Sequence, residues 1–137
     1  MSVHLEDVHA IERLKHEYCY TIDDGDYDAW VGLFTEDGRF VRSGKSVHEG
    51  HEELTEFATE GFDAAFEQSA HVVTNPVIDV DEDGAEATGT WYLLLLYEDA
   101  EGTTGWTQAR YDDEYRKVDG EWRIADATLT YGVTHDA

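Results

Sequence analysis

The chain contains very little cysteine, and it contains no long hydrophobic run. Cys19 is the only cysteine, so no internal disulfide can form. A chain without disulfides is typical of a reducing compartment, and we expect a cytoplasmic protein. The first residues lack the basic and apolar segments of a signal peptide, which favours the same compartment. No stretch of about 18 apolar residues occurs, so we expect no helix that crosses a membrane.

Basic residues are also scarce. The 137 residues include 9 Lys and Arg against 32 Asp and Glu, which gives a formal net charge of -23. Nucleic acids and anionic membrane surfaces are bound through basic faces, so we expect neither as a partner. The acidic residues are spread along the whole chain, and this distribution is typical of proteins adapted to high salt.

This excess of negative charge predicts that stability depends on salt. At ~1 M salt the Debye length is only about 3 Å, which screens the repulsion between surface carboxylates. We therefore expect a larger free energy of unfolding in molar salt than in dilute buffer. Denaturation at both salt concentrations measures the difference, and equal stability would contradict a salt-adapted origin.

What the chain does contain is enough apolar material for one folded domain. Hydrophobic residues make up 41% of the sequence and aromatic residues 12%. A chain of this length can bury roughly two-thirds of its surface in a single core. It shows no internal repeat, linker or low-complexity segment, so we expect a single domain over residues 1–137.

The first part of the chain has helical periodicity. Apolar residues between Leu5 and Ile22 recur at helical spacing and predict a helix whose buried stripe includes Tyr18. Gly25 is expected to end this helix, and Asp26 to begin a second, short one. A short strand at 39–42, a helix beginning near residue 49 and a loop or ragged helix over 61–69 should follow.

After residue 69 the period changes from helical to alternating. The alternation predicts four strands, with Asp-Gly hairpin turns after the first and third, at residues 71–80, 86–97, 106–118 and 121–131. Pro76 in the first strand indicates an edge position or a bulge. Helices followed by a meander predict an α+β fold, with N-terminal helices packed in a curved antiparallel or mixed sheet. Such a sheet can form a cone-shaped barrel that encloses a pocket.

The central strands carry aromatic residues that could line this pocket. Strand alternation sends about half of them inward, where they would suit a flat hydrophobic ligand. The alternative is ordinary sheet packing or an oligomer face. The candidate substrate-binding residues are Trp91, Tyr92, Tyr97, Trp106, Tyr111 and Asp113. Asp113 could act as a second acid or could be a solvated carboxylate.

Cofactor signatures are absent from the sequence. His48 and His51 are three residues apart near a helix start, but no third ligand is identifiable, so we expect no metal. No glycine-rich phosphate loop occurs, so we expect no nucleotide cofactor. Cys19 has no neighbouring base that would make it a nucleophile.

Several local segments are similar to those of a known superfamily. They are DDGDYDAW (23–30), LFTEDG (33–38), GHEEL (50–54), HVVTN (71–75) and YRKVDGEWRI (115–124). In these segments and in the order of its elements, the chain resembles the SnoaL-like branch of the nuclear transport factor 2-like superfamily. The resemblance extends over almost the whole chain and implies the same cone-shaped α+β fold. Many different activities occur on this fold.

The resemblance also implies a pair of catalytic residues. Three lyases of the superfamily (scytalone dehydratase, hexachlorocyclohexane dehydrochlorinase and bile-acid dehydratase) place an aspartate at the end of the first helix and a histidine at the start of the first long strand. The matching positions here are Asp23 and His71, and Tyr18 matches a pocket tyrosine. In this interpretation Asp23 orients His71 as a base. Alternatively, Asp23 caps a helix and His71 is a packed strand residue.

These residues lead to three functional hypotheses. The first is a cofactor-independent lyase of the dehydratase or dehydrohalogenase type, acting on a small hydrophobic or cyclic molecule. The second is a polyketide-cyclase-like or isomerase enzyme that uses the same dyad. In ketosteroid isomerases, however, the carboxylate base would fall near Arg42, which cannot act as that base. The third is a non-catalytic ligand-binding or assembly module. We also expect a homo-oligomer, a dimer or trimer, formed through the exposed sheet face.

Overall fold

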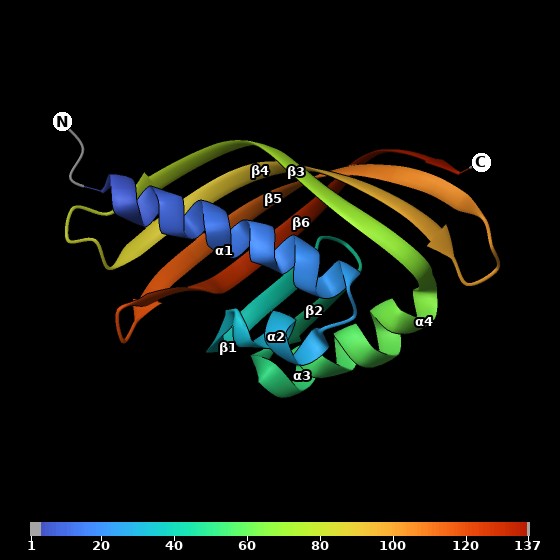
Figure 1. The fold of residues 1–137 in the computed structure, drawn as a ribbon, viewed down its shortest axis with the longest axis horizontal. Helices are drawn as coiled ribbons and strands as arrows, with labels where there is room; N and C mark the ends of the chain where they lie inside the picture. The colour runs from blue at the N-terminus through green and yellow to red at the C-terminus, as the bar shows by residue number, and fades with distance from the viewer. Residues whose placement is uncertain (1–3, 137) are drawn as a thin grey trace.

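The computed structural model describes residues 4–136 (Figure 1). The helical elements are α1 (Leu5–Asp23), α2 (Tyr27–Gly32), α3 (Gly50–Glu56), the π-helix η1 (Phe57–Phe62) and α4 (Asp63–Ala65). The strands are β1 (Phe34–Arg42), β2 (Ser46–Glu49), β3 (Phe66–Val80), β4 (Glu86–Asp99), β5 (Thr104–Val118) and β6 (Glu121–Asp136). Helices thus precede the long strands, as the sequence predicted.

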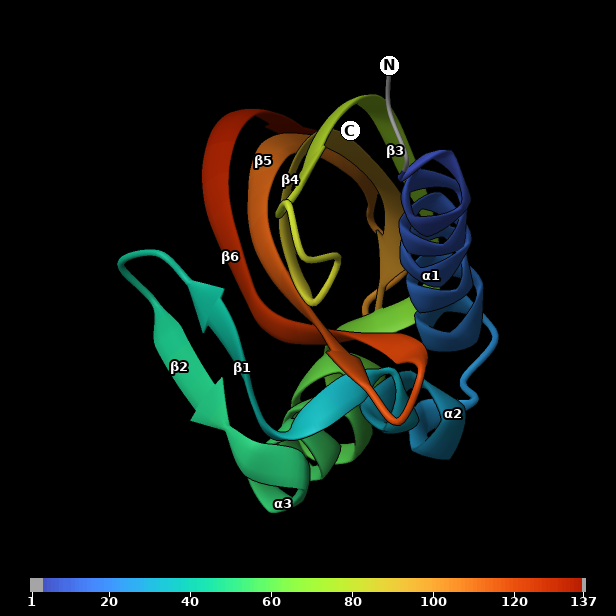
Figure 2. The same cartoon turned by 90° about the vertical axis from the view of Figure 1, so that its left-hand side faces the viewer.

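The six strands form one mixed sheet in the order β2-β1-β6-β5-β4-β3. Only β1 and β6 run parallel, and every other neighbouring pair is antiparallel. The sheet curls strongly, and α1 lies across its open side (Figure 2). The expected α+β class, with N-terminal helices against a curved mixed sheet, is confirmed. Among residues 4–136, no helix is long and apolar enough to cross a membrane.

Helix α1 follows the predicted stripe. Its buried positions include Ile11, Tyr18 and Ile22, which face the concave side of the sheet. Gly25 has a φ of +76°, a left-handed conformation that glycine adopts without steric cost at the end of a helix. Asp26 precedes α2 as expected, but its side chain makes no capping hydrogen bond.

The prediction for the first strand was too short, because β1 begins at Phe34 rather than at 39. The register of β1 with β6 shifts between Phe34 and Arg39, which marks a bulge where the sequence indicated a turn. A Cβ on Gly38 would lie 2.9 Å from the Cβ of Phe34, so the bulge needs a glycine there. Strand β2, which pairs with β1, was not predicted at all.

The prediction of a loop or ragged helix over 61–69 was partly wrong. The helical region continues through η1 and α4 only to residue 65, and β3 begins at Phe66. The ring of Phe66 packs against Phe62 and Tyr97, which anchors the start of the strand. Strands β4 and β6 also extend beyond their predicted ends, and β5 begins at Thr104, before its predicted start at residue 106. Pro76 lies where the β3–β4 register shifts, and β3 is an edge strand, so both alternatives for Pro76 are confirmed.

Candidate functional site

The sheet and helices enclose a cavity of about 730 Å³. This volume lies within the range of sites for small molecules. Its wall combines rings and aliphatic side chains from α1, η1 and the inner face of the sheet. Lining residues include Tyr18, Ile22, Trp30, Phe40, Arg42, Lys45, His48, Phe57, Phe62, Phe66, His71, Leu93, Leu95, Tyr97, Tyr111, Leu129 and Tyr131. The cavity is therefore mainly apolar and aromatic, with a few polar groups.

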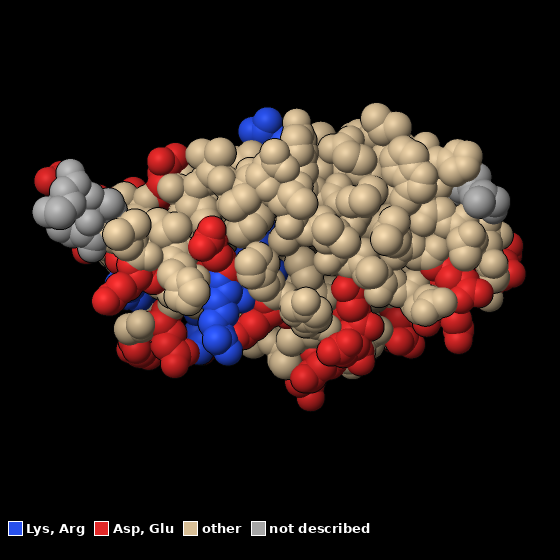
Figure 3. Space-filling model, turned by 45° about the horizontal axis from the view of Figure 1, so that its top comes forward, with Lys and Arg blue, Asp and Glu red and all other residues tan. Residues whose placement is uncertain are grey.

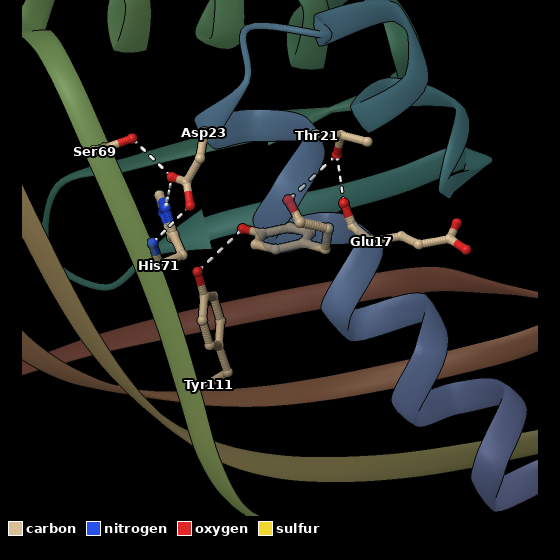
Figure 4. Close-up of polar contacts among 7 residues, drawn as sticks. Glu17, Thr21, Asp23, Ser69, His71 and Tyr111 are labelled. Carbon is tan, nitrogen blue, oxygen red and sulfur yellow. Dashed lines mark hydrogen bonds and ion pairs between the residues drawn. The ribbon is translucent and has the colours of Figure 1, made fainter.

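His71 lines this cavity, and Asp23 meets it from behind the wall although 48 positions separate the two residues in the sequence. Asp23 is the last residue of α1, and His71 lies on β3, which packs beside α1 (Figure 4). The Nδ1 atom of His71 lies 2.6 Å from Oδ1 of Asp23. The backbone N–H of His71 also donates to Oδ2 of Asp23, at 2.7 Å. Two bonds from one residue fix the carboxylate relative to the imidazole.

A third donor completes the carboxylate's surroundings. The hydroxyl of Ser69 donates to Oδ1 of Asp23 at 2.7 Å. The side chain of Asp23 is 16% exposed and that of His71 only 7%. Because Asp23 is acceptor-only when ionised, it favours the tautomer of His71 with the proton on Nδ1. Within residues 4–136, Nε2 of His71 has no hydrogen-bond partner and remains available as a base.

Tyr18 lies next to the dyad and is only 2% exposed. Its ring is 6.5 Å from the imidazole of His71 between centroids. The Tyr111 hydroxyl donates to the Tyr18 hydroxyl at 3.3 Å. Burial raises the pKa of Tyr18 well above its usual value. Tyr18 therefore stays protonated, and its hydroxyl can donate to an oxygen atom of a ligand.

The structure separates the other candidate residues by sheet face. Tyr97 and Tyr111 line the cavity with Tyr18. Trp91 also points inward, but it lies under α1, where its ring meets that of His16. Tyr92 is exposed and Trp106 half-buried on the outer face, where they pair with Arg110 and Leu96 of the neighbouring strands. The geometry thus brings Tyr18, Tyr97 and Tyr111 together but not Trp91, Tyr92 or Trp106.

Asp113 is neither solvated nor part of the cavity wall. It is fully buried beneath α1, where Oδ2 lies 2.9 Å from Nζ of Lys15. The Tyr115 hydroxyl also donates to Oδ2, at 2.7 Å. The ammonium of Lys15 lies 3.4 Å from the centroid of the Tyr111 ring and 4.2 Å from that of Tyr18. Through this buried ion pair, the ammonium of Lys15 is held against the rings of both cavity tyrosines.

Four residues near the site were not predicted from the sequence to line the cavity or to support the dyad, although His48 was considered as a metal ligand. Ser69 lies two positions before His71, so strand alternation could have placed both on one face. Lys15 lies on the buried stripe of α1. The helical pattern at this position fits an apolar residue equally well, so the pattern did not indicate a role for the lysine. Trp30 borders the cavity, and its indole N–H has no partner within residues 4–136. His48 comes from β2, the strand that the pattern did not reveal.

The two histidines considered for metal binding face different partners. Nε2 of His48 is 3.0 Å from the hydroxyl of Ser46, and His48 lines the cavity. Nε2 of His51 is 3.1 Å from the carbonyl oxygen of Phe34. Residues 4–136 contain no group of three or more potential ligands for a metal. Cys19 is buried, which raises the pKa of its thiol to about 12, so it is a poor nucleophile.

Solved structures of other proteins share this architecture. A Novosphingobium aromaticivorans protein, provisionally assigned as a scytalone dehydratase, is 26% identical with a TM-score of 0.88; the match covers 97% of this chain and 89% of that one. Rv3472 of Mycobacterium tuberculosis, a protein of unknown function, is 32% identical over 92% of this chain and 72% of its own, with a TM-score of 0.80. Hexachlorocyclohexane dehydrochlorinase LinA-type3 from Novosphingobium barchaimii is 17% identical, with a TM-score of 0.88 and coverage of 97% and 91%. This last likeness shows the fold alone.

A family comparison agrees with these structural neighbours. The model of the SnoaL-like domain matches residues 3–128, which is most of the chain. The match includes the end of α1, the start of β3 and most of the residues that line the cavity. The curved sheet, the helical cover and the matched residues together show that the chain belongs to the SnoaL-like family.

Proposed function

We propose that this chain is a cofactor-independent lyase that eliminates water or halide from a small hydrophobic or cyclic molecule. The observation that carries the proposal is that His71 lines a mainly apolar cavity while its Nδ1 lies 2.6 Å from the carboxylate of Asp23. The 26%-identical Novosphingobium aromaticivorans protein that is provisionally assigned as a scytalone dehydratase supports it.

The proposed reaction uses three side chains. Nε2 of His71 removes a proton from a substrate carbon, while Asp23 stabilises the imidazolium that forms. The electrons of the broken C–H bond form a new carbon–carbon double bond. The leaving group departs from the adjacent carbon with its bonding pair, as hydroxide or halide. The proton on His71 then passes to the hydroxide, giving water, or to solvent.

Tyr18 supplies a neutral hydrogen-bond donor in this scheme. Its own hydroxyl accepts a hydrogen bond from Tyr111, so the Tyr18 proton is free to point at a substrate oxygen. A donor held by a buried network needs little reorganisation as negative charge develops on that oxygen. Tyr18 would therefore stabilise an enolate oxygen or assist a departing hydroxyl.

A substrate screen tests this function. Small cyclic hydroxy-ketones and halides should yield unsaturated products with the wild-type chain but not with His71→Ala. Release of water or halide should match the double bonds formed, one for one. Ligand binding without turnover across the whole screen would favour a non-catalytic binding module, and formation of a rearranged product without loss of a leaving group would favour an isomerase.

We also propose that the chain self-associates through the outer face of the sheet. Val72, Tyr92, Leu94 and Leu96 are exposed there on β3 and β4, and few acidic side chains interrupt this face (Figure 3). An exposed apolar patch is unusual in a chain with a net charge of -23. Light scattering in molar salt should give the mass of a dimer or trimer. Leu94→Glu should lower it, and a monomeric wild-type mass would contradict self-association.

A further inference from the structure

The basic residues of this chain differ in whether they have a carboxylate partner. The chain has nine Lys and Arg. Seven of them form an ion pair with a carboxylate in the structure: Arg13, Lys15, Arg39, Arg110, Arg116, Lys117 and Arg123. The two without a carboxylate partner within residues 4–136 are Arg42 and Lys45. Both line the cavity.

Local structure explains why these two cations lie together. Arg42 ends β1, and Ser46 pairs with it at the start of β2. The hairpin between them is closed by a hydrogen bond from the backbone N–H of Lys45 to the carbonyl of Arg42, at 2.8 Å. Gly44, with a φ of +75°, allows this tight return. The hairpin therefore places both positive side chains at the same end of the cavity.

Tyr131 of β6 positions the pair. Nε of Arg42 donates to the Tyr131 hydroxyl at 2.9 Å, while Nζ of Lys45 lies 5.2 Å from the centroid of the Tyr131 ring. These contacts orient the two cations without neutralising them, because a phenol hydroxyl and an aromatic ring carry no net charge. His48 on the same hairpin does not neutralise them either, because an imidazole carries no negative charge, and burial and Arg42 lower its pKa.

Two carboxylates also border the cavity, but neither pairs with these cations. Oδ1 of Asp99 accepts the backbone N–H groups of Glu101 and Thr103, so Asp99 holds the β4–β5 turn. Glu56, at the end of α3, is exposed. The chain has more than three acidic residues for each basic one, so a carboxylate partner is expected for every cation. Two cations that lack such a partner beside a ligand cavity are therefore an exception that needs an explanation. An anionic ligand group is the partner that fits them.

We infer that the cavity is specific for small cyclic carboxylates, whose carboxylate is bound by Arg42 and Lys45 while the apolar ring extends toward Tyr18 and His71. This inference deepens the proposed function by naming its substrate class. A carboxylate suits the planar guanidinium of Arg42, which can donate two hydrogen bonds to it. The aromatic wall between the hairpin and the dyad would cover the ring.

Binding of a matched pair of probes tests this inference. The probes are 2-naphthoate and its neutral analogue 2-naphthamide. Calorimetry at one fixed salt concentration measures the affinity of the chain for each. The wild-type chain should bind the carboxylate at least about tenfold more tightly than the amide. The double variant Arg42→Gln/Lys45→Gln should bind both probes equally. Arg42→Lys with native Lys45 should retain part of the preference, because it keeps the charge.

A charge-matched control separates local binding from the overall charge. Arg13→Gln/Arg110→Gln removes two cations from exposed positions outside the cavity wall, and it should keep the full preference for the carboxylate. Equal affinity of the wild type for the two probes, or failure to bind the carboxylate, would overturn the inference. A preference that persists in Arg42→Gln/Lys45→Gln, or that the control loses equally, would also overturn it.

The result of this binding comparison does not depend on whether the chain is a lyase. Carboxylate-selective binding with no turnover would support this inference and count against the proposed elimination. Conversely, elimination from a neutral substrate at an unchanged rate in Arg42→Gln/Lys45→Gln would overturn the inference and leave the elimination intact. Thermal unfolding of each variant shows whether it is folded, and the single variants Arg42→Gln and Lys45→Gln replace the double variant if it is not.

Discussion

Replacing His71 with alanine is expected to lower kcat/KM by about 10²–10⁴-fold on any substrate that the chain turns over, because a positioned base contributes that much. The imidazole is buried and bonded to Asp23, so the base cannot be replaced by solvent in the same geometry. Steady-state kinetics on a substrate from the screen measure the loss. An activity within threefold of the wild type would contradict the role of His71.

Asp23→Asn is expected to have an effect of similar order, although it preserves size. The carboxylate accepts three hydrogen bonds, from Ser69, from the His71 backbone and from Nδ1 of His71. An amide presents one oxygen and one NH₂ group, so it cannot accept all three in this arrangement. Because Asp23 and His71 act as a unit, the double variant should lose little more than His71→Ala alone.

Ser69→Ala serves as the graded control for these variants. It removes a single hydrogen bond to Oδ1 of Asp23 and leaves the contacts of His71 in place. We expect a loss of no more than about tenfold, the upper end for one typical hydrogen bond, because Asp23 keeps its two bonds from His71. A loss as large as that of Asp23→Asn would mean that Ser69 itself takes part in the reaction.

Lys15→Met is expected to destabilise the fold by about 3–5 kcal/mol, the largest effect on stability that we predict. The change leaves the carboxylate of Asp113 fully buried without its cation, and breaking one half of a buried pair costs about this much. Chemical denaturation at neutral pH and constant salt measures the difference. A change below about 1 kcal/mol would contradict the buried ion pair.

Two further variants isolate the cause. Lys15→Met/Asp113→Asn removes both charges and should recover a large part of the lost stability. Lys117→Met breaks a more exposed pair with Asp7 and should cost no more than about 1 kcal/mol. If the double variant is as unstable as Lys15→Met, the loss comes from packing of the lysine side chain and not from the unpaired carboxylate.

The Lys15→Met variant should also change the pH dependence of stability. Burial already raises the pKa of Asp113, and Lys15 opposes that rise. Without Lys15 the folded-state pKa rises further above its unfolded value. The native state then binds a proton more readily than the unfolded state, so the variant should lose stability as pH rises through that folded pKa. The deficit relative to wild type should therefore shrink on acidification.

The fold class follows from one feature of the sequence, the change from helical to alternating periodicity after residue 69. That change identifies helices packed on a meander without any knowledge of relatives. Strand β2 could not be recognised in this way, because Ser46–Glu49 is only four residues long and its pairing depends on β1. The start of β3 was missed because the packing of a half-buried ring, Phe66, determines it and not an alternating pattern.

The candidate site depends on information that periodicity does not contain. Nothing local to Asp23 or His71 shows that they meet, and only the resemblance to known lyases suggested their pairing. Strand alternation did indicate that Tyr111 and Asp113 point the same way. It could not show that Asp113 would meet Lys15 under α1 while Tyr111 borders the cavity, because that depends on where the helix crosses the sheet.

The tautomer of His71 in solution is the most direct test of the proposed dyad. Two-bond correlations between the ring nitrogens and ring protons in ¹⁵N-labelled protein, recorded with the imidazole neutral, distinguish which nitrogen carries the proton. The structure predicts that Nδ1 is protonated toward Asp23 and Nε2 is unprotonated, and that Asp23→Asn abolishes this preference. A proton on Nε2 in the wild type, or a tautomer unaffected by Asp23→Asn, would contradict a base oriented by Asp23.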